Sequence, residues 1–270
     1  MVMSDVGTLI RHWRRARGLS QLALSAESVV SLRHLSFIET GRASPSRAMV
    51  LKLAEVLDVP LRERNSLLLA AGFAPVYRES ALDVPEMAAI RAALDAILTH
   101  QEPYPALVMD REWNIRRTNA AAARFFGFLQ AGHDTAAPGP PNVLRRMFHP
   151  DGVRRYVRNW PDVSEALVRR VRREAVGGLA DERAQSILRE VLAYPGVPAS
   201  LKSLDATVPT LPVVPIEYAR DGREFDYFST VTTLGTAQDI TLQELRIECF
   251  FPANEETRRL AYALAESAAS

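Results

Sequence analysis

Residues 6–72 form a series of short helical patterns, each bounded by residues that start or end a helix. Glycines that can adopt the left-handed conformation end three of these patterns, and serines that can cap a helix precede three of them. The boundary residues are Gly18, Ser20, Ser31, Gly41, Ser44-Pro45 and Gly72. They predict helices over about 6–17, 21–28, 31–40 and 61–71, and another with Ser44 as its cap and Pro45 at its first position. Five short helices in one segment predict a compact all-α unit.

Charge is distributed unevenly along the chain. The net charge is only +1, from 33 Lys and Arg against 32 Asp and Glu. Residues 1–78 hold 11 of the basic and 6 of the acidic residues, so this segment carries +5. The remainder, with 22 basic and 26 acidic residues, carries −4. Such an asymmetry indicates a basic module joined to a part with a different task.

The rest of the chain mixes helices and strands. The patterns predict a connector helix over 85–99, strands at 106–110 and 113–118, a helix from Asn119 to Phe126, a largely helical stretch over 142–205, strands at 212–219, 224–232 and 242–251, and a last helix over about 254–266. The sequence Arg220-Asp221-Gly222-Arg223 predicts a tight hairpin between two of these strands. In the last strand Leu245, Ile247, Cys249 and Phe251 alternate with Glu244, Arg246, Glu248 and Phe250, which is typical of a half-buried strand.

These elements define the fold class. Two strands before the helical stretch and three after it can close into one antiparallel five-stranded sheet with helices on one face. The expected class is α+β: an all-α five-helix domain, followed by a five-stranded antiparallel sheet with a large helical insertion. The three expected parts are residues 1–73, a linker and connector helix over 74–100, and residues 101–270.

Composition excludes several other classes of protein. With 47% apolar and 24% charged residues, the chain is an ordinary globular protein and not a disordered one. Cys249 is the only cysteine, so an intramolecular disulfide and a multi-thiolate zinc site are excluded. The first residues place an acid before a short apolar run and arginines after it, the reverse of a secretory signal, and no stretch of 18 apolar residues exists. A soluble cytoplasmic protein without a membrane partner is expected.

One segment resembles a known DNA-binding unit. Leu19-Ser20-Gln21, followed by Ser31-Leu32-Arg33-His34-Leu35-Ser36-Phe37-Ile38-Glu39-Thr40-Gly41, is similar to the helix-turn-helix of phage-repressor-like (XRE/Cro) regulators. The resemblance covers about residues 6–72 and implies a lambda-repressor-like fold. Val29 departs from the pattern, since the family often has glycine in the turn between the two helices.

The resemblance implies which residues contact double-stranded DNA. A recognition helix presents the residues of its N-terminal half to base edges in the major groove, and helix N-termini contact phosphates. The expected base-facing residues are Leu32, Arg33, His34 and Phe37, and the expected phosphate contacts are Gln21, Ser31, Arg42 and Arg47. Arg33 can bind guanine through two hydrogen bonds. The same resemblance implies a structural ion pair between Arg14 and Glu39.

The whole chain, moreover, resembles the MmyB-like transcriptional regulators, which join such a head to a PAS-like ligand-binding domain. The supporting segments are Ser31–Gly41, Leu61–Gly72, Glu102-Pro-Tyr-Pro-Ala-Leu-Val108, the hairpin and helix start over 105–121, and Asn159-Trp160. The stretch 203–208 lacks the Trp-x-x-His-like pattern of many relatives. The resemblance implies a regulator with operator half-sites about 34 Å apart, a homodimer, and a ligand-dependent signal that passes through the connector helix over 85–99.

An apolar pocket is expected between the sheet and the helices. Its candidate lining is Met109, Ile115, Phe125, Leu144, Met147, Phe148, Trp160, Leu167, Ile216, Tyr227 and Ile247. A fatty-acid-like molecule would suit such a lining, whereas the alternative is that these side chains simply fill the core. His100, His133 and His149 lack metal-ligand spacing, so no metal or haem site is expected.

Two functions remain open after enzymes are set aside. No nucleophile elbow, phosphate loop or metal motif is present, so the chain is not expected to be an enzyme. The first function is a sequence-specific transcriptional regulator whose DNA affinity depends on a small apolar ligand. The alternative is a constitutive DNA-binding scaffold whose C-terminal domain serves dimerisation or binds a protein partner without a ligand.

Overall fold

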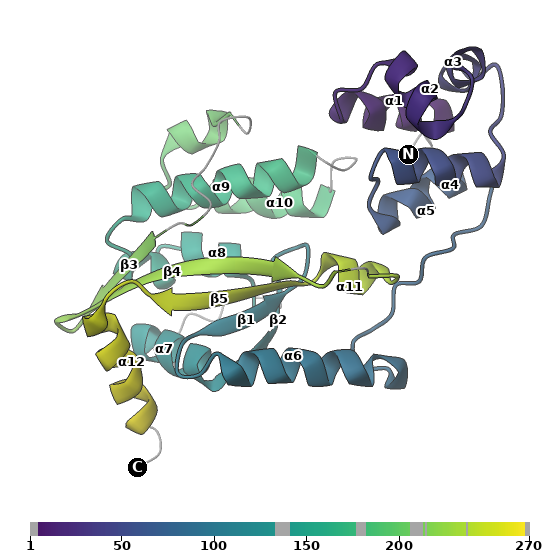
Figure 1. Cartoon of the computed structure of the whole chain (residues 1–270). Helices are drawn as coiled ribbons and strands as arrows, with labels where there is room; N and C mark the ends of the chain where they lie inside the picture. Colours follow the sequence, from purple (N-terminus) through teal and green to yellow (C-terminus); the bar gives the residue numbers. More distant parts are fainter. Residues whose placement is uncertain are drawn as a thin grey trace. The chain divides into compact units, whose positions relative to one another are not determined.

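A computed structural model describes residues 5–132, 141–176, 182–205, 213, 215–235 and 237–267. The chain divides into two compact units. Of the described residues, one unit contains those up to Ser80 together with residues 174–176 and 237–243, and the other contains the rest. Figure 1 labels the elements of both units, which are described separately below. Within the described ranges, no helix combines the length and apolar character needed to cross a membrane.

The part of the first unit up to Ser80, called the head from here on, is the predicted five-helix domain. Its helices are α1 (Val6–Ala16), α2 (Gln21–Ser28), α3 (Leu32–Glu39), α4 (Arg47–Val56) and α5 (Leu61–Ala70). Ser20 caps α2 by accepting a hydrogen bond from the Ala23 N–H, and Ser31 caps α3 in the same way from the His34 N–H. Apolar side chains from all five helices, including Trp13, Leu24, Leu35, Leu53 and Leu68, form one buried core. The predicted helix pattern is therefore confirmed.

The start of α4 differs from the prediction. Ser46, and not Ser44, caps this helix, since its hydroxyl accepts a hydrogen bond from the Met49 N–H at 3.3 Å. Pro45 consequently lies outside the helix and is buried. The sequence offers two capping serines within three residues, and local chemistry alone does not choose between them.

Val29 ends α2 in a strained conformation. It has φ +58° and ψ +29°, the left-handed region, and its side chain is 89% exposed. This conformation costs an L-residue about 1–2 kcal/mol, and a β-branched residue is especially poorly suited to it. Glycine, which relatives often have in this turn, avoids this strain.

Replacing Val29 with Gly is therefore expected to stabilise the head by about 0.5–1 kcal/mol, after allowance for the greater freedom of glycine in the unfolded chain. Thermal denaturation should show the transition of the head rising by about 4 °C. Val29→Ala, which removes the β-branch but not the strained φ, should gain less. A lower transition temperature for Val29→Gly would contradict this account of the turn.

The second unit contains one antiparallel five-stranded sheet with strand order β2-β1-β5-β4-β3. The strands are β1 (Ala106–Met109), β2 (Ile115–Thr118), β3 (Pro215–Arg220), β4 (Arg223–Thr233) and β5 (Arg246–Pro252). Asp221 and Gly222, with φ +50° and +73°, form the predicted tight hairpin between β3 and β4. The fold class is thus confirmed as α+β, with an all-α head.

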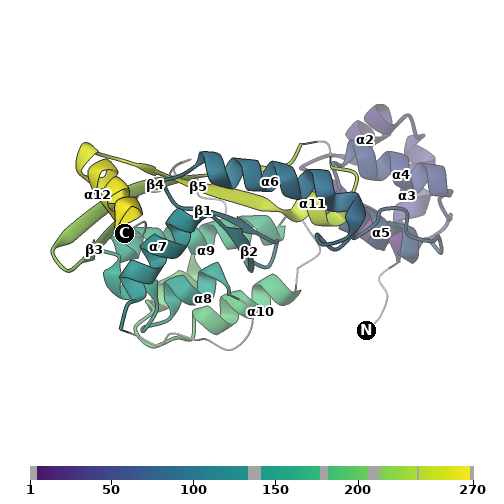
Figure 2. The same cartoon turned by 90° about the horizontal axis from the view of Figure 1, so that it is seen from below.

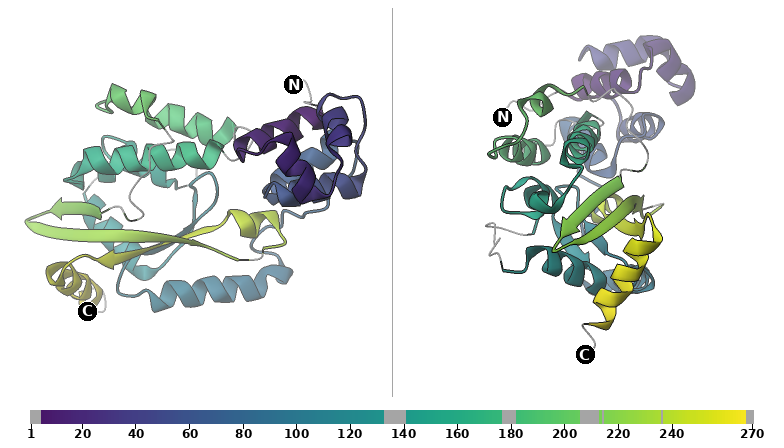
Figure 3. Two further views of the ribbon diagram at one scale, coloured as in Figure 1. Left: turned by 45° about the horizontal axis from the view of Figure 1, so that its top comes forward. Right: turned by 90° about the vertical axis from the view of Figure 1, so that its left-hand side faces the viewer.

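Helices cover both faces of this sheet. They are α6 (Ala88–His100), α7 (Ala120–Gln130), α8 (Val143–Phe148), α9 (Trp160–Val176), α10 (Glu182–Val191), α11 (Ile240–Glu244) and α12 (Glu255–Glu266), with short 3-10 turns at Pro85–Met87, Val153–Tyr156 and Ala199–Ser203. In Figure 2, α6 runs along one side of the sheet, whereas α7, α8, α9 and α10 lie on the other side. Figure 3 shows the same layers from two further directions. The helices α7 to α10 and the strands enclose the larger apolar core.

The last strand differs from its predicted form in two ways. Residues 240–244 form α11, so β5 begins only at Arg246. Its side toward α7 and α8 carries Glu248 and Phe250, and not Cys249 and Phe251. Ile247 is buried on the opposite face, where it pairs with Val108. Alternation correctly predicts a strand here, but because both of its faces are covered, it does not tell which face meets the larger core.

The helix predicted over 85–99 is a 3-10 turn followed by α6. Met87, Leu94 and Leu98 are buried, as its apolar stripe predicts, whereas Ile97 is 38% exposed. The helix belongs to the second unit. It is tied to that unit by Asn119, whose side-chain amide donates to the Leu98 carbonyl at 3.3 Å while its oxygen caps α7. The connector helix is thus an integral part of the sheet domain.

Candidate functional site

The helix α3 has one face in the core of the head and one face in solvent. Leu35 and Ile38 are fully buried in the core. Leu32 and Arg33 are exposed, and the Arg33 guanidinium lies 5.4 Å from the centre of the Phe37 ring. This stacking orders a long side chain that would otherwise be free. The exposed face of α3 therefore presents a guanidinium and apolar groups, the chemistry that reads base edges in a major groove.

The expected phosphate-contacting residues have different surroundings. Ser31 is exposed at the N-terminus of α3, where its hydroxyl serves as the cap. Arg42 and Arg47 are exposed, and neither side chain has an ion pair with any residue in the described part of the chain. The Gln21 side chain donates to Glu39 Oε2 at 2.8 Å, so one of its two amide N–H groups is already used within the head. His34 is half-buried.

The head contains the ion pair that the resemblance implies. Arg14 Nε and Nη2 donate to the two oxygens of Glu39 at 2.6 and 2.8 Å, and the Glu39 side chain is completely buried. Burial by itself would raise the pKa of Glu39, but hydrogen bonds from Arg14 and Gln21 and the positive charges of Arg14 and Arg11 outweigh it and lower this pKa. The pair joins α1 to the end of α3 and so fixes the orientation of α3.

The second unit contains a cavity of about 460 Å³ between the sheet and the helices α7 and α8. Its lining is mostly apolar and comes from both sequence halves of the domain. The apolar residues around it are Leu107, Ile115, Ala122, Ala123, Phe126, Pro141, Val143, Met147, Val153, Leu167, Ile216 and Phe250. A cavity of this size can take one small apolar molecule.

Four charged side chains also line this cavity. Arg116 forms an ion pair with Asp110 at 2.6 Å, and Arg117 forms one with Asp95 at 2.8 Å. Glu248 is buried and accepts a hydrogen bond from the Ser229 hydroxyl at 2.7 Å. The fourth is Arg146.

Arg146, on α8, differs from the other two arginines in its surroundings. Its side chain makes no hydrogen bond or ion pair with the residues that the structure describes, although it is partly buried. Burial therefore lowers the pKa of its guanidinium, and no acidic group in the described ranges compensates for this effect. A partly buried positive charge without a partner is costly, and a bound anion would remove that cost.

The structure divides the residues expected to line the pocket into two groups. Ile115, Met147, Leu167 and Ile216 line the cavity. The others are not among its lining residues: Met109, Phe125, Leu144, Phe148, Trp160, Tyr227 and Ile247. Most of these fill the core, which is the alternative that the sequence left open.

Ring packing and strand register explain their placement. Phe125 is fully enclosed by the rings of Tyr218, Phe225 and Tyr227, with centroids 5.1 to 5.3 Å away. Its neighbour on α7, Phe126, lines the cavity instead. Ile247 lies on the sheet face away from the cavity, since Glu248 beside it is on the cavity face.

Sequence reasoning missed the polar residues of the cavity. Arg146 is one of many arginines in the helical stretch 142–205, and nothing in its local pattern sets it apart. Glu248 stands at a position that alternation assigns to the solvent side of β5. Gly127, also in the lining, shows a sequence signal, because glycine is unfavourable inside a helix such as α7.

The two described histidines that were considered as metal or haem ligands, His100 and His149, do not form a common site. His100 and His149 engage backbone groups within their own segments, at Ala96 and Asp151. His133 lies outside the described residues. Across the described ranges, no cluster of three or more His, Cys, Asp and Glu residues has an arrangement suited to a metal ion.

Comparison with protein families gives two matches. Residues 90–264 match the MmyB-like transcription regulator ligand binding domain. Residues 10–64 match a helix-turn-helix domain. The first match contains most of α6 and the entire sheet, and the second contains α2 and α3.

Individual relatives match less of the chain. The uncharacterized HTH-type transcriptional regulator RghRB of Bacillus subtilis (strain 168) is 38% identical over 85 residues, which are 31% of this chain and 59% of that protein. The chain thus spans less than two thirds of this relative. Among solved structures, that of an RNA-binding light-oxygen-voltage receptor is matched over 98% of this chain and 63% of the receptor, with 14% identity and a TM-score of 0.26.

Proposed function

The chain belongs to the MmyB-like transcription regulators, and we propose that the DNA affinity of its helix-turn-helix head is controlled by a fatty-acid-like molecule in the cavity of its ligand-binding domain. An HTH regulator with a ligand-binding domain has two tasks, and the two units offer one candidate site for each. The single observation that carries the choice of ligand is the position of Arg146.

Arg146 and the apolar lining together favour an amphipathic anion. A guanidinium binds a carboxylate through two parallel hydrogen bonds, which are stronger than those between neutral groups. The apolar side chains around the cavity favour a hydrocarbon chain, at about 0.8 kcal/mol for each buried methylene group. A carboxylate at Arg146 with its chain along Met147, Leu107 and Phe250 uses both features.

A pair of probes that differ only in the head group tests this assignment. Palmitate, a 16-carbon fatty acid, should bind the full chain about ten-fold to a hundred-fold more tightly than hexadecanol, because a hydrogen bond to a charged group contributes about 1.5–3 kcal/mol. Arg146→Ala should remove this difference, and Arg146→Lys should keep part of it. Equal affinities of the wild-type protein for the two probes, measured by calorimetry, would contradict a role of Arg146 as the anchor.

The exposed face of α3 supports a role of Arg33 in base recognition. Arg33→Ala should weaken binding to DNA selected by the protein from a random pool by about 1–3 kcal/mol and relax the preference at one base pair. Arg47→Ala, a phosphate contact by expectation, should weaken binding to all sequences and reduce its salt dependence. Gel-shift titrations with single-base variants of the DNA distinguish these outcomes, and an unchanged preference for Arg33→Ala removes it from base recognition.

We further propose that two chains bind one operator. Residues 1–78 carry a net charge of only +5 and so offer few positive charges for non-specific binding, so two heads on half-sites about 34 Å apart supply the affinity that one lacks. Sedimentation of the protein with its selected DNA should give two chains per duplex. One chain per duplex at saturation contradicts the proposal.

A further inference from the structure

The connection between β4 and β5 belongs to the head's compact unit, although both strands belong to the sheet. Residues 237–243 leave the sheet after β4, and β5 begins shortly after them at Arg246. The chain thus passes from the cavity-lining sheet into the head's unit and back again within a few residues. The β4–β5 connection is therefore continuous at both ends with strands of the sheet, while residues 237–243 belong to the same unit as the head.

Gln243 completes the N-terminus of a head helix. Pro60 stands at the N-cap position of α5 and has no side chain that can accept a hydrogen bond. The Leu61 N–H, one of the unsatisfied donors at this helix end, instead donates to Gln243 Oε1 at 2.7 Å. A residue of the β4–β5 connection therefore provides the cap that the head's own sequence lacks.

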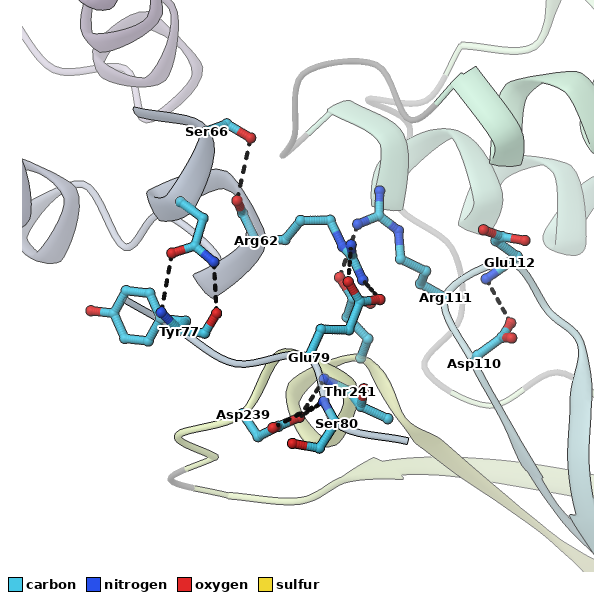
Figure 4. A network of polar contacts seen from close by, with 12 residues as sticks. Arg62, Ser66, Tyr77, Glu79, Ser80, Asp110, Arg111, Glu112, Asp239 and Thr241 are labelled. Carbon is cyan, nitrogen blue, oxygen red and sulfur yellow. Dashed lines mark hydrogen bonds and ion pairs between the residues drawn. The ribbon is translucent and has the colours of Figure 1, made fainter. Parts of the chain in front are cut away.

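Asp239 joins the same connection to the segment that follows α5. Its carboxylate accepts hydrogen bonds from the Ser80 N–H at 3.2 Å and from the Thr241 N–H at 2.9 Å, and the Ile240 N–H donates to the Arg78 carbonyl at 2.8 Å. Figure 4 shows the hydrogen bonds of this carboxylate to Ser80 and Thr241.

The segment that Asp239 holds is itself fixed to α5. The Asn65 side chain accepts from the Val76 and Tyr77 N–H groups and donates to the Tyr77 carbonyl, and Arg62 pairs with Glu79. Residues 237–243, residues 76–80 and α5 therefore form one hydrogen-bonded cluster.

The other end of this connection reaches the cavity. Glu248 and Phe250 of β5 line it, and Ser229 of β4 donates to Glu248. Glu248 is five residues beyond Gln243, which is at most about 17 Å along the chain. A molecule that displaces Glu248 or Phe250 thus acts on a strand whose first residues are continuous with the cap of α5.

We propose that residues 237–243 transmit the state of the cavity to the head, through the cap that Gln243 places on α5 and the clamp that Asp239 places on Ser80. This inference rests on the proposed function, since it states how occupancy of the cavity alters the head. The β4–β5 connection, and not the helix over 85–99 that the sequence suggested, would then transmit the ligand-dependent signal.

Amide hydrogen exchange of the full chain tests the proposal in two arms. The first arm adds palmitate. The second uses Gly127→Phe, which places a ring at the lining of the cavity without an added compound, because a Cβ at this position meets no atom within 4 Å. Each arm should change the exchange rates of residues 61–66 and 237–243 by about five-fold or more, the range of ordinary coupling between two sites.

Four variants assign the effect to the two contacts. Gln243→Ala and Asp239→Ala remove the acceptor oxygens, so the response of residues 61–66 should fall below about two-fold, while palmitate still binds. Gln243→Glu and Asp239→Asn keep an acceptor oxygen and should keep the response. Retained palmitate binding also shows that the sheet domain of each variant is folded.

Two results would overturn the proposal: residues 61–66 that respond in neither arm, or alanine variants that respond as the wild-type chain does. If palmitate does not bind the wild-type chain, the assignment of the ligand fails, and the Gly127→Phe arm alone decides the coupling. The two failures are therefore distinguishable.

Discussion

Replacing Glu39 with Gln is expected to reduce the free energy of unfolding of the head by about 3–5 kcal/mol, because it leaves the buried Arg14 guanidinium without its counter-charge. The total free energy of unfolding of a small domain is only about 5–15 kcal/mol, so the head of this variant would be close to unfolding at room temperature. Urea denaturation followed by amide exchange in α1 and α3 measures the loss. DNA binding should fail together with it.

An exposed ion pair of the same head provides the matched control. Lys52 and Glu55 lie on the surface of α4, 3.3 Å apart. Lys52→Ala should change the stability by less than about 1 kcal/mol, since exposed pairs contribute little. If the Glu39 variant were as mild as this control, the pair would not be what orients α3.

The same carboxylate gives the head a pH dependence with a definite sign. Because the folded-state pKa of Glu39 is lower than that of the unfolded chain, its contribution is fully present above the ordinary carboxyl range and is lost as the pH falls through the lowered pKa. Glu39→Gln should remove this part of the acid dependence.

Gly127→Phe is expected to weaken palmitate binding about a hundred-fold. Gly127 lies in α7 at the lining of the cavity, and a Cβ built on it has open space around it. A phenyl ring there takes the place of roughly four methylene groups of the ligand, each worth about 0.8 kcal/mol. Calorimetric titration with palmitate measures the change.

Gly127→Ala is the control for this variant. Alanine removes the flexibility of glycine from the helix, so it should stabilise the domain by up to about 1 kcal/mol and leave most of the cavity free. Palmitate affinity should stay near that of the wild-type protein. Unchanged affinity in both variants would place the ligand elsewhere in the domain.

The head was predictable because its signals are local. A capping serine acts on an N–H three residues away, and a glycine such as Gly18 or Gly41, which both have positive φ, acts on the turn that it occupies. The failure at Ser44 has the same origin, since two serines compete for one helix start. The pairing of Arg14 with Glu39 came from resemblance, and its spacing of 25 residues gives no local signal.

The cavity was less predictable because its residues meet only through the tertiary fold. Ile115, Ile216 and Met147 were identified as apolar candidates, but their type does not separate a cavity wall from a filled core. Glu248 has a polar side chain on a strand with both faces covered, so alternation misplaced it. Arg146 is distinguished only by the absence of a partner among the described residues, which the sequence does not reveal. The β4–β5 connection is distinguished by hydrogen bonds to residues 159 to 182 positions away in sequence, which local patterns do not predict either.

The central claim is that occupancy of the cavity changes the affinity of the head for DNA. Fluorescence anisotropy of a labelled duplex, selected by the protein from a random pool, gives the dissociation constant with and without palmitate. The wild-type chain should show a change of about five-fold or more, and Arg146→Ala should show none at the same palmitate concentration. A dissociation constant that is unaltered by palmitate, in protein shown by native mass spectrometry to carry it, would contradict the claim.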